Sequence, residues 1–149
     1  MERLPYIDEI MTNVRSNREV AWEALLPVLR AAFSGGPAGP FGRALGVVPA
    51  RAVGVWGEPG SALPGFAVER VRRPERLELR GGHRFSRYTL VIELDELGGD
   101  AARVRARTYA DFPGLKGRAY RALVIRSGAH RIVTRRLLSR VASRAATRV

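Results

Sequence analysis

The segment HRFSRYTLVIELDELGGDAARVRARTYADF, residues 83–112, decides the fold that the sequence predicts. It contains two runs in which apolar and polar residues alternate, separated by Gly98, Gly99 and Asp100. Successive side chains of a β-strand point to opposite faces of the sheet, and glycine with aspartate is typical of the turn between two strands. The segment therefore predicts an antiparallel hairpin that has one apolar face toward a core and one charged face toward solvent.

The charges of this hairpin predict the register of its strands. With residues 98–100 as a three-residue loop, Leu97 lies opposite Ala101. The outer face then pairs Asp95 with Arg103, Glu93 with Arg105 and Arg87 with Asp111. Each exposed pair contributes only about 0.2–1 kcal/mol, but a shifted register would bring like charges together. We interpret most of these arginines as the solvated, charge-paired back of a sheet, with an anion-binding surface as the alternative.

The residues before the hairpin predict a strand followed by a helix. Residues 5–14 show the rough alternation of a strand, and Ser16 with Glu19 forms the pattern of a capping box at a helix start. Pro27 lacks a backbone N–H, so we expect this helix to kink or restart there and to end near Phe33.

Three further strands are expected between this helix and the hairpin. One lies within residues 45–56, and FAVERVR (residues 66–72) and RLELR (residues 76–80) form two more, joined by a tight turn. His83 follows a glycine pair, and we expect it to be exposed and to have no role.

The last third of the chain predicts one long helix, from about Leu115 to Ala145, which we expect Gly128 to bend. Residues at spacings of three and four form an inward stripe: Ala119, Tyr120, Leu123, Ser127, His130, Val133, Thr134, Leu137, Leu138 and Val141. Four of them, namely Tyr120, Ser127, His130 and Thr134, are polar. Because a buried polar group needs a hydrogen-bonding partner or water, the stripe favours a lined cavity over a solid core.

The 149 residues carry a formal net charge of +12, and the excess lies entirely in the last third. Residues 101–149 contain 12 Arg and Lys116 against one acidic residue, Asp111. This charge favours anionic partners, although 25 of the 26 basic residues are Arg, which a coding bias explains equally well. No nucleic-acid-binding motif is present, so we expect no specific nucleic-acid partner. Ile125 and Ile132 interrupt the basic helix face and leave open a contact with anionic lipid or with a second subunit in a homodimer.

Catalytic and metal-binding motifs are absent from the sequence. There is no cysteine, His83 and His130 are far apart, and no HExxH, GxSxG or phosphate-binding loop occurs. We therefore expect neither a metal nor another cofactor. No stretch approaches the roughly 18 apolar residues of a membrane span, and no signal-peptide pattern appears, so we expect a cytoplasmic protein.

The order of these elements resembles the START-type helix-grip superfamily, also called SRPBCC, which includes polyketide cyclase/dehydrase and lipid-transport domains. PYIDEIMTNV with REVAWEALL is similar to its first strand and helix, PGFAVERVRRPERLEL to its paired middle strands, and RTYADFPGLKGRAYRALV to its strand-to-long-helix junction. The resemblance spans nearly the whole chain and implies one ligand-binding domain over residues 1–149. The implied fold is α+β: a curved antiparallel sheet wrapped around a long C-terminal helix, with a kinked N-terminal helix pair and a cavity for an apolar ligand.

From this resemblance and the inward stripe, we predict that a lipid-like or polyketide-like molecule binds between the sheet and the C-terminal helix. The expected lining is Tyr88, Leu90, Ile92, Thr108, Tyr120, Leu123, Ser127, His130 and Thr134, with a pocket that touches at least His130, Tyr120 and Tyr88. One alternative is a polyketide cyclase or dehydratase that uses Tyr120 and His130, because an imidazole acts as an acid or a base near neutral pH. The other is an interaction protein that uses the basic last third to contact anionic partners.

Overall fold

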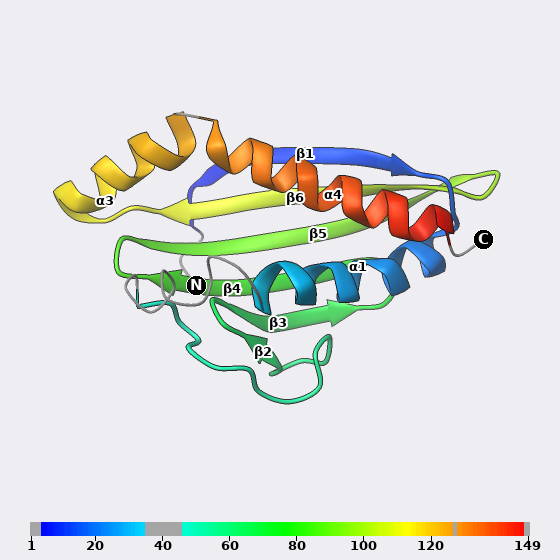
Figure 1. Cartoon of the computed structure of the whole chain (residues 1–149), viewed down its shortest axis with the longest axis horizontal. Coiled ribbons are helices and arrows are strands. Elements are labelled where there is room, and N and C mark those ends of the chain that lie inside the picture. Colours follow the sequence, from blue (N-terminus) through cyan, green and yellow to red (C-terminus); the bar gives the residue numbers. More distant parts are fainter. Residues whose placement is uncertain (1–3, 35–45, 127, 148–149) are drawn as a thin grey trace.

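The computed structural model of the chain describes residues 4–34, 46–126 and 128–147. A six-stranded antiparallel sheet has the order β1-β6-β5-β4-β3-β2, so the first strand lies beside the last (Figure 1). The strands are β1 (Tyr6–Val14), β2 (Ala62–Leu63), β3 (Phe66–Arg72), β4 (Arg76–His83), β5 (Ser86–Gly98) and β6 (Ala101–Asp111). The helices are α1 (Arg18–Ser34), α3 (Gly114–Arg121), the π-helix η2 (Ala122–Arg126) and α4 (Ala129–Thr147). This is the α+β class that the sequence predicts.

The hairpin of β5 and β6 has the predicted register. Opposed residues include Glu93 with Arg105, Asp95 with Arg103 and Arg87 with Asp111. The turn differs from the prediction, because Gly98 pairs with Ala101 and the register shifts at Leu97 as in a β-bulge. Gly98, Gly99 and Asp100 all have positive φ, a conformation that glycine adopts at little cost, and this permits the tighter turn.

The outer face of the sheet carries ion pairs that join three neighbouring strands. Arg105 Nε lies 2.7 Å from Asp95 Oδ2, and Arg105 Nη2 lies 3.5 Å from Glu93 Oε2. Arg107 pairs with Glu93 and also with Glu9 of β1. Partners therefore lie diagonally as well as directly opposite, and the interpretation of these arginines as the charge-paired back of the sheet is confirmed.

Helix α1 is one helix from Arg18 to Ser34, and the prediction of a helix pair is wrong. Pro27 removes one helical hydrogen bond, but Leu25, Val28 and Leu29 on either side of it are buried in the core. Since most helical stability in a protein comes from packing of the apolar face, burial on both sides of the proline keeps the helix continuous.

The N-cap of α1 is Asn17, and the prediction of Ser16 is wrong. Asn17 Oδ1 accepts a hydrogen bond from the backbone N–H of Val20 at 2.9 Å. Ser16 Oγ instead donates to the Asn17 carbonyl at 3.1 Å. Both residue types are good caps, but the hydroxyl of the buried Ser16 is engaged as a donor to the Asn17 carbonyl, while Asn17 accepts from the first turn of the helix.

The C-terminal segment is broken into α3, η2 and α4, with Gly128 at a φ of 80° before α4. Within α4 the predicted inward stripe holds for the buried residues Thr134, Leu137, Leu138 and Val141. Its members Ala119, Leu123 and Val133 are exposed, and for these three the predicted inward orientation is wrong. The wider π-helix and the left-handed glycine change the helical phase, so residues three and four apart no longer share one face along the whole segment.

No strand forms in the described residues 46–56, where the sequence predicts one. Val48 and Val53 make only isolated bridges, to Gly82 and Ala62. Glycines with positive φ at positions 46 and 54 interrupt the extended backbone that a longer strand requires.

Helices α1 and α4 lie side by side over one face of the sheet, which we call the inner face (Figure 1). The fully buried side chains of the core include Trp22, Leu25, Leu29, Leu77, Leu79, Ile92 and Leu138. Helix α3 lies past the end of α4, near the end of β6 (Figure 1). The main core is therefore located beneath α1 and α4, and the end of the sheet near α3 is outside it.

Candidate functional site

The inner face of the sheet is sealed beneath α1 and α4 and becomes less covered toward α3. Ile92 of β5 is fully buried, whereas Leu90, which is nearer to α3, retains 9% exposure. Tyr88 is next on this face and is only half-buried. We call the four side chains Tyr88, Leu90, Thr108 and Ala110 the floor, since Tyr88 lies opposite Ala110 and Leu90 opposite Thr108. Within this floor Tyr88 is half-buried, and Leu90, Thr108 and Ala110 are buried.

Aromatic rings form a continuous row across the same end of the inner face. Phe33 of α1 stacks on Phe66 of β3 with ring centroids 3.8 Å apart, and Phe66 lies 5.2 Å from Tyr88. His83 of β4 lies 6.1 Å from Tyr88, and Tyr120 of α3 lies 4.7 Å from His83. We call these five side chains the aromatic row. It joins five elements into one apolar wall that has few hydrogen-bonding groups, as is typical of small-molecule sites.

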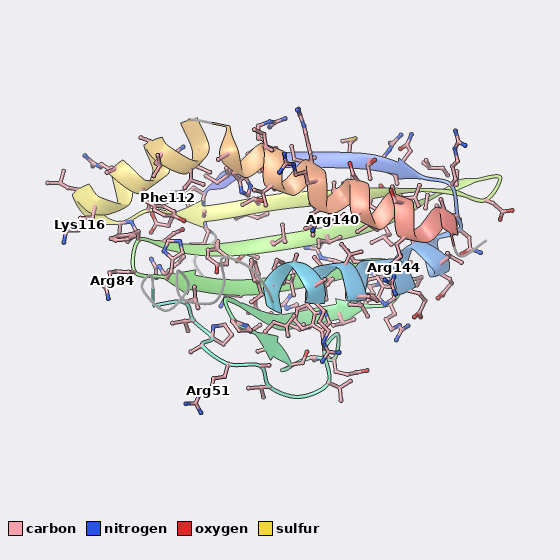
Figure 2. All side chains as sticks on the ribbon, in the orientation of Figure 1. Arg51, Arg84, Phe112, Lys116, Arg140 and Arg144 are labelled. Carbon is pink, nitrogen blue, oxygen red and sulfur yellow. The ribbon has the colours of Figure 1, made fainter. Side chains whose placement is uncertain are left out.

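Tyr120 is held at the α3 end of the row by further rings. Its centroid lies 5.7 Å from that of Phe85 and 6.3 Å from that of Phe112. A Cβ at Gly117 would lie 2.6 Å from the Phe112 backbone, so glycine is what lets α3 approach the end of β6 this closely. Phe112 and the exposed cations Arg84 and Lys116 lie at this end of the molecule (Figure 2).

Tyr88 is fixed in the middle of the row by a hydrogen bond. Its hydroxyl donates to the Gly65 carbonyl at 2.7 Å. A Cβ at Gly81 would lie 1.8 Å from that carbonyl oxygen, so Gly81 permits the contact. Burial raises the pKa of Tyr88 well above its usual value, the neighbouring Tyr120 adds to this rise, and burial also raises the pKa of Tyr120. Both hydroxyls are therefore protonated at neutral pH, and the wall is uncharged at these positions.

His83 belongs to the aromatic row, and the prediction that it is exposed is wrong. Its ring is half-buried beside Tyr88 and Tyr120. Its Nδ1 accepts the backbone N–H of Phe85 at 3.0 Å, which places the proton of the neutral ring on Nε2. Burial lowers the pKa of His83, so the neutral form is favoured near pH 7.

A polar cluster of Asp8, Thr108 and His130 borders the floor on the side of β1. Asp8 lies opposite Thr108 in the sheet and is only 8% exposed. His130, in the first turn of α4, places Nε2 3.1 Å from Thr108 Oγ1 and 3.4 Å from Asp8 Oδ1. Arg131 Nη1 lies 3.9 Å from the other oxygen of Asp8. A carboxylate, an imidazole and a hydroxyl therefore meet at one point of the inner face.

The structure brings together five of the nine predicted lining residues. Those on the floor, in the aromatic row or in the polar cluster are Tyr88, Leu90, Thr108, Tyr120 and His130. Ile92 and Thr134 are buried within the core, and the Thr134 hydroxyl donates to the carbonyl of His130 at 2.8 Å. Leu123 is 71% exposed, so the inward orientation predicted for it is wrong. Ser127 lies outside the described residues.

Tyr120 and His130 have different partners, although the sequence predicts them on one line of the helix. Tyr120 contacts the rings of the aromatic row, and His130 contacts Asp8 and Thr108. The break at Gly128 separates the two residues into different helices. A reaction that uses both as one catalytic pair stays a prediction.

Sequence reasoning missed four residues of this region: Asp8, Phe33, Phe66 and His83. For Asp8 a signal existed, because it has the same strand parity as the buried Ile10 and Val14. For the three rings no local pattern was available, because their contacts join segments far apart in the sequence.

Three hollows in the described part of the chain have other linings. One of about 510 Å³ lies against α1 and α4 and is lined by Val28, Ser139, Arg140, Ser143 and Arg144. One of about 400 Å³ is lined by Leu4, Pro5, Arg80, Gly81, Arg87, Tyr88 and Asp111. The third, of about 580 Å³, is lined by Pro59, Arg70, Val71, Arg72, Arg76 and Glu78. Of the predicted lining residues, only Tyr88 borders one of these three, and a pocket shared by His130, Tyr120 and Tyr88 stays a prediction.

Two other kinds of feature are absent from the described residues. Within residues 4–34, 46–126 and 128–147, no three His, Asp or Glu side chains are grouped so that they could hold a metal ion. In the same ranges, no helix is long and apolar enough to cross a membrane.

Solved structures share this fold over nearly the whole chain. A conserved protein from Geobacillus kaustophilus is 13% identical, with 93% of this chain and 94% of that chain covered and a TM-score of 0.60. Ara h 8.0201 is 10% identical, with coverage of 94% and 97% and a TM-score of 0.56. DynU16, a protein of the dynemicin biosynthetic locus, is 15% identical with a TM-score of 0.56; 93% of this chain is covered, and it spans about half of DynU16 (46%).

These similarities show that the chain shares its α+β fold with these proteins, and this fold is consistent with a helix grip. No protein-family model matches the sequence, and no curated protein matches it.

Proposed function

We propose that the chain binds an apolar small molecule, lipid-like or polyketide-like, against the floor and the aromatic row. The row supplies an apolar wall, and the polar cluster supplies a few hydrogen-bonding groups at one edge. This combination is the general form of small-molecule sites. The fold neighbours support the proposal, since DynU16 belongs to a biosynthetic locus.

The aromatic row is the observation that carries the proposal. All five of its rings are only partly buried, although they contact one another. Each Å² of apolar surface that a ligand covers contributes about 25 cal/mol, so rings that remain partly uncovered favour binding. Because burial raises the pKa of both tyrosines and lowers that of His83, the row carries no charge near pH 7. An uncharged aromatic wall favours an apolar and partly aromatic ligand.

Fluorescence titration with N-phenyl-1-naphthylamine, an uncharged apolar probe, tests this proposal. The Tyr120→Ala variant removes one end of the row, and Tyr109→Ala is its matched control on the outer face of the sheet. An aromatic contact contributes about 0.5–1.5 kcal/mol, so Tyr120→Ala should weaken binding by about twofold to tenfold. Tyr109→Ala should leave it unchanged.

Equal effects of the two substitutions would place the probe elsewhere and contradict the proposal. Absence of any saturable binding to the parent protein would also contradict it. Native mass spectrometry of the purified protein adds an independent measurement, because a co-purified ligand should be lost from Tyr120→Ala more readily than from Tyr109→Ala.

A further inference from the structure

We propose that His130, positioned by Asp8, is the hydrogen-bond acceptor for a hydroxyl group of the ligand. The inference rests on the proposed function and adds a ligand class to it: an apolar molecule that carries a phenol or enol hydroxyl. The observations behind it come from the polar cluster, whereas the aromatic row carries the proposed function.

The position of Asp8 is the first step. Asp8 faces the inner side of β1, in line with the buried residues Ile10 and Val14, and its side chain is more than nine-tenths buried. Its Oδ1 atom is shielded from solvent and makes no hydrogen bond within the described residues. Burial of a carboxylate oxygen without a hydrogen bond is costly, so a residue that only fills the core would be apolar here.

The second step is the tautomer of the His130 imidazole, which lies next to this oxygen. His130 Nε2 lies 3.4 Å from Asp8 Oδ1 and 3.1 Å from Thr108 Oγ1. An ionised carboxylate only accepts hydrogen bonds. The contact between Asp8 and the neutral His130 ring is therefore favourable when the proton of the ring is on Nε2. Nδ1 then carries the lone pair. In this arrangement Asp8 acts through His130, as a carboxylate does when it fixes the tautomer of a neighbouring histidine.

The cluster lies where a ligand on the floor would meet it. Thr108 belongs to both the polar cluster and the floor, where it lies opposite Leu90. The next inward-facing residue of β6 is Ala110, the partner of Tyr88. The side chain of His130 is 23% exposed, so the ring is accessible from outside the core.

Three other polar atoms of this region have partners among the described residues. The hydroxyl of Tyr88 donates to Gly65, and that of Thr134 donates to the His130 carbonyl. Nδ1 of His83 accepts the Phe85 amide. The contacts of the His130 ring with described residues are all made through Nε2. With its proton on Nε2, the His130 ring offers Nδ1 as an acceptor to a protic group at this edge of the site.

A pair of probes that differ in one hydroxyl tests the inference. We would measure binding of 2-naphthol and 2-methoxynaphthalene to the parent protein, to His130→Phe and to Asp8→Asn. A hydrogen bond contributes about 0.5–1.5 kcal/mol, so the parent's preference for 2-naphthol should exceed that of His130→Phe by about twofold to tenfold. Affinity for 2-methoxynaphthalene should be similar in both. His130→Leu replaces His130→Phe if the larger ring prevents folding.

The role of Asp8 has a separate readout. Imidazole ¹⁵N–¹H correlation spectra of the parent should show His130 with its proton on Nε2. In Asp8→Asn they should show a mixture of tautomers, with a smaller preference for 2-naphthol. An unchanged tautomer and an unchanged preference in Asp8→Asn would overturn the positioning role.

Two results would overturn the inference in different ways. If both probes bind and their affinity ratio is the same in the parent and in His130→Phe, the hydroxyl acceptor is wrong and the proposed function stands. If neither probe binds the parent protein, the proposed function fails and this inference fails with it.

Discussion

Replacing Arg105 with methionine would test how the outer face of the sheet is stabilised. Arg105 lies at the centre of the charged outer face: its Nε and Nη2 lie 2.7 and 3.1 Å from the two oxygens of Asp95. Its guanidinium also lies 3.5 Å from Glu93 and 3.8 Å from Glu9. Methionine keeps the length and the apolar part of the side chain but removes every one of these contacts.

The expected loss follows from the partial burial of Arg105, whose side chain is 25% exposed. Fully exposed ion pairs contribute about 0.2–1 kcal/mol, and hydrogen bonds to charged groups that are removed from water about 1.5–3 kcal/mol. A two-bond contact with intermediate exposure should contribute about 1–2 kcal/mol. For a chain of this length, that corresponds to a decrease in Tm of about 2–8 °C.

Arg103→Met is the matched control, because Arg103 is on the same face of β6 and donates to Asn13 Oδ1 at 3.2 Å. It should lower the free energy of unfolding by no more than about 0.5 kcal/mol. Urea unfolding of both variants at low and high salt measures the difference, which should shrink as salt screens the charges. Equal destabilisation by the two substitutions would refute the reasoning, since it would mean that the ion pairs of Arg105 contribute no more than the single hydrogen bond from Arg103 to Asn13.

Three further predictions concern other parts of the molecule. Gly81→Ala should destabilise the protein by more than about 2 kcal/mol in urea unfolding, because the new Cβ would overlap the Gly65 carbonyl that Tyr88 bonds. Burial lowers the pKa of His83, so the unfolded state binds a proton at this residue before the folded state does, and stability is lost as pH falls below about 6.5. His83→Phe should reduce this loss, which thermal unfolding at a series of pH values measures. Binding to double-stranded DNA, followed by fluorescence anisotropy, should be independent of sequence and lost by about 200 mM salt, because only phosphate contacts are expected.

The β5–β6 hairpin was predictable because two local signals agree there. The alternation of apolar and charged residues set the faces, and the pairing of charges set the register. Only the turn was wrong, since a bulge at Leu97 shortens the loop by one residue. A bulge depends on how the ends of the two strands twist, which the alternating pattern does not encode.

Helical periodicity was a weaker guide because it assumes a constant phase. The stripe predicted for the C-terminal segment holds from Thr134 to Val141 within α4 and fails at Leu123, before that helix. A π-helix and a left-handed Gly128 lie between the two halves, and each rotates the helix relative to an ideal one. Conversely, Pro27 did not interrupt α1, since tertiary packing outweighed the local propensity.

The candidate site was only partly predictable, because it depends on contacts between distant segments. Thr108 and His130 were predicted from their inward positions, but Asp8 of the first strand was not connected with them. The aromatic row likewise joins residues from Phe33 to Tyr120. Composition and periodicity describe neighbours along the chain and contain no information on such long-range pairs.

The position of β1 beside β6 has a consequence for how the protein folds. Asp8 is paired with Thr108, so β1 has no partner strand until a hundred further residues have been synthesised. Closure of so long a loop is slow, and sheets with many non-local pairs fold in milliseconds to seconds. Until then the backbone groups of β1 are unpaired, as they are along the edge of a sheet. Since Asp8, Thr108 and His130 come together only after this step, the polar cluster should be one of the last parts of the molecule to form.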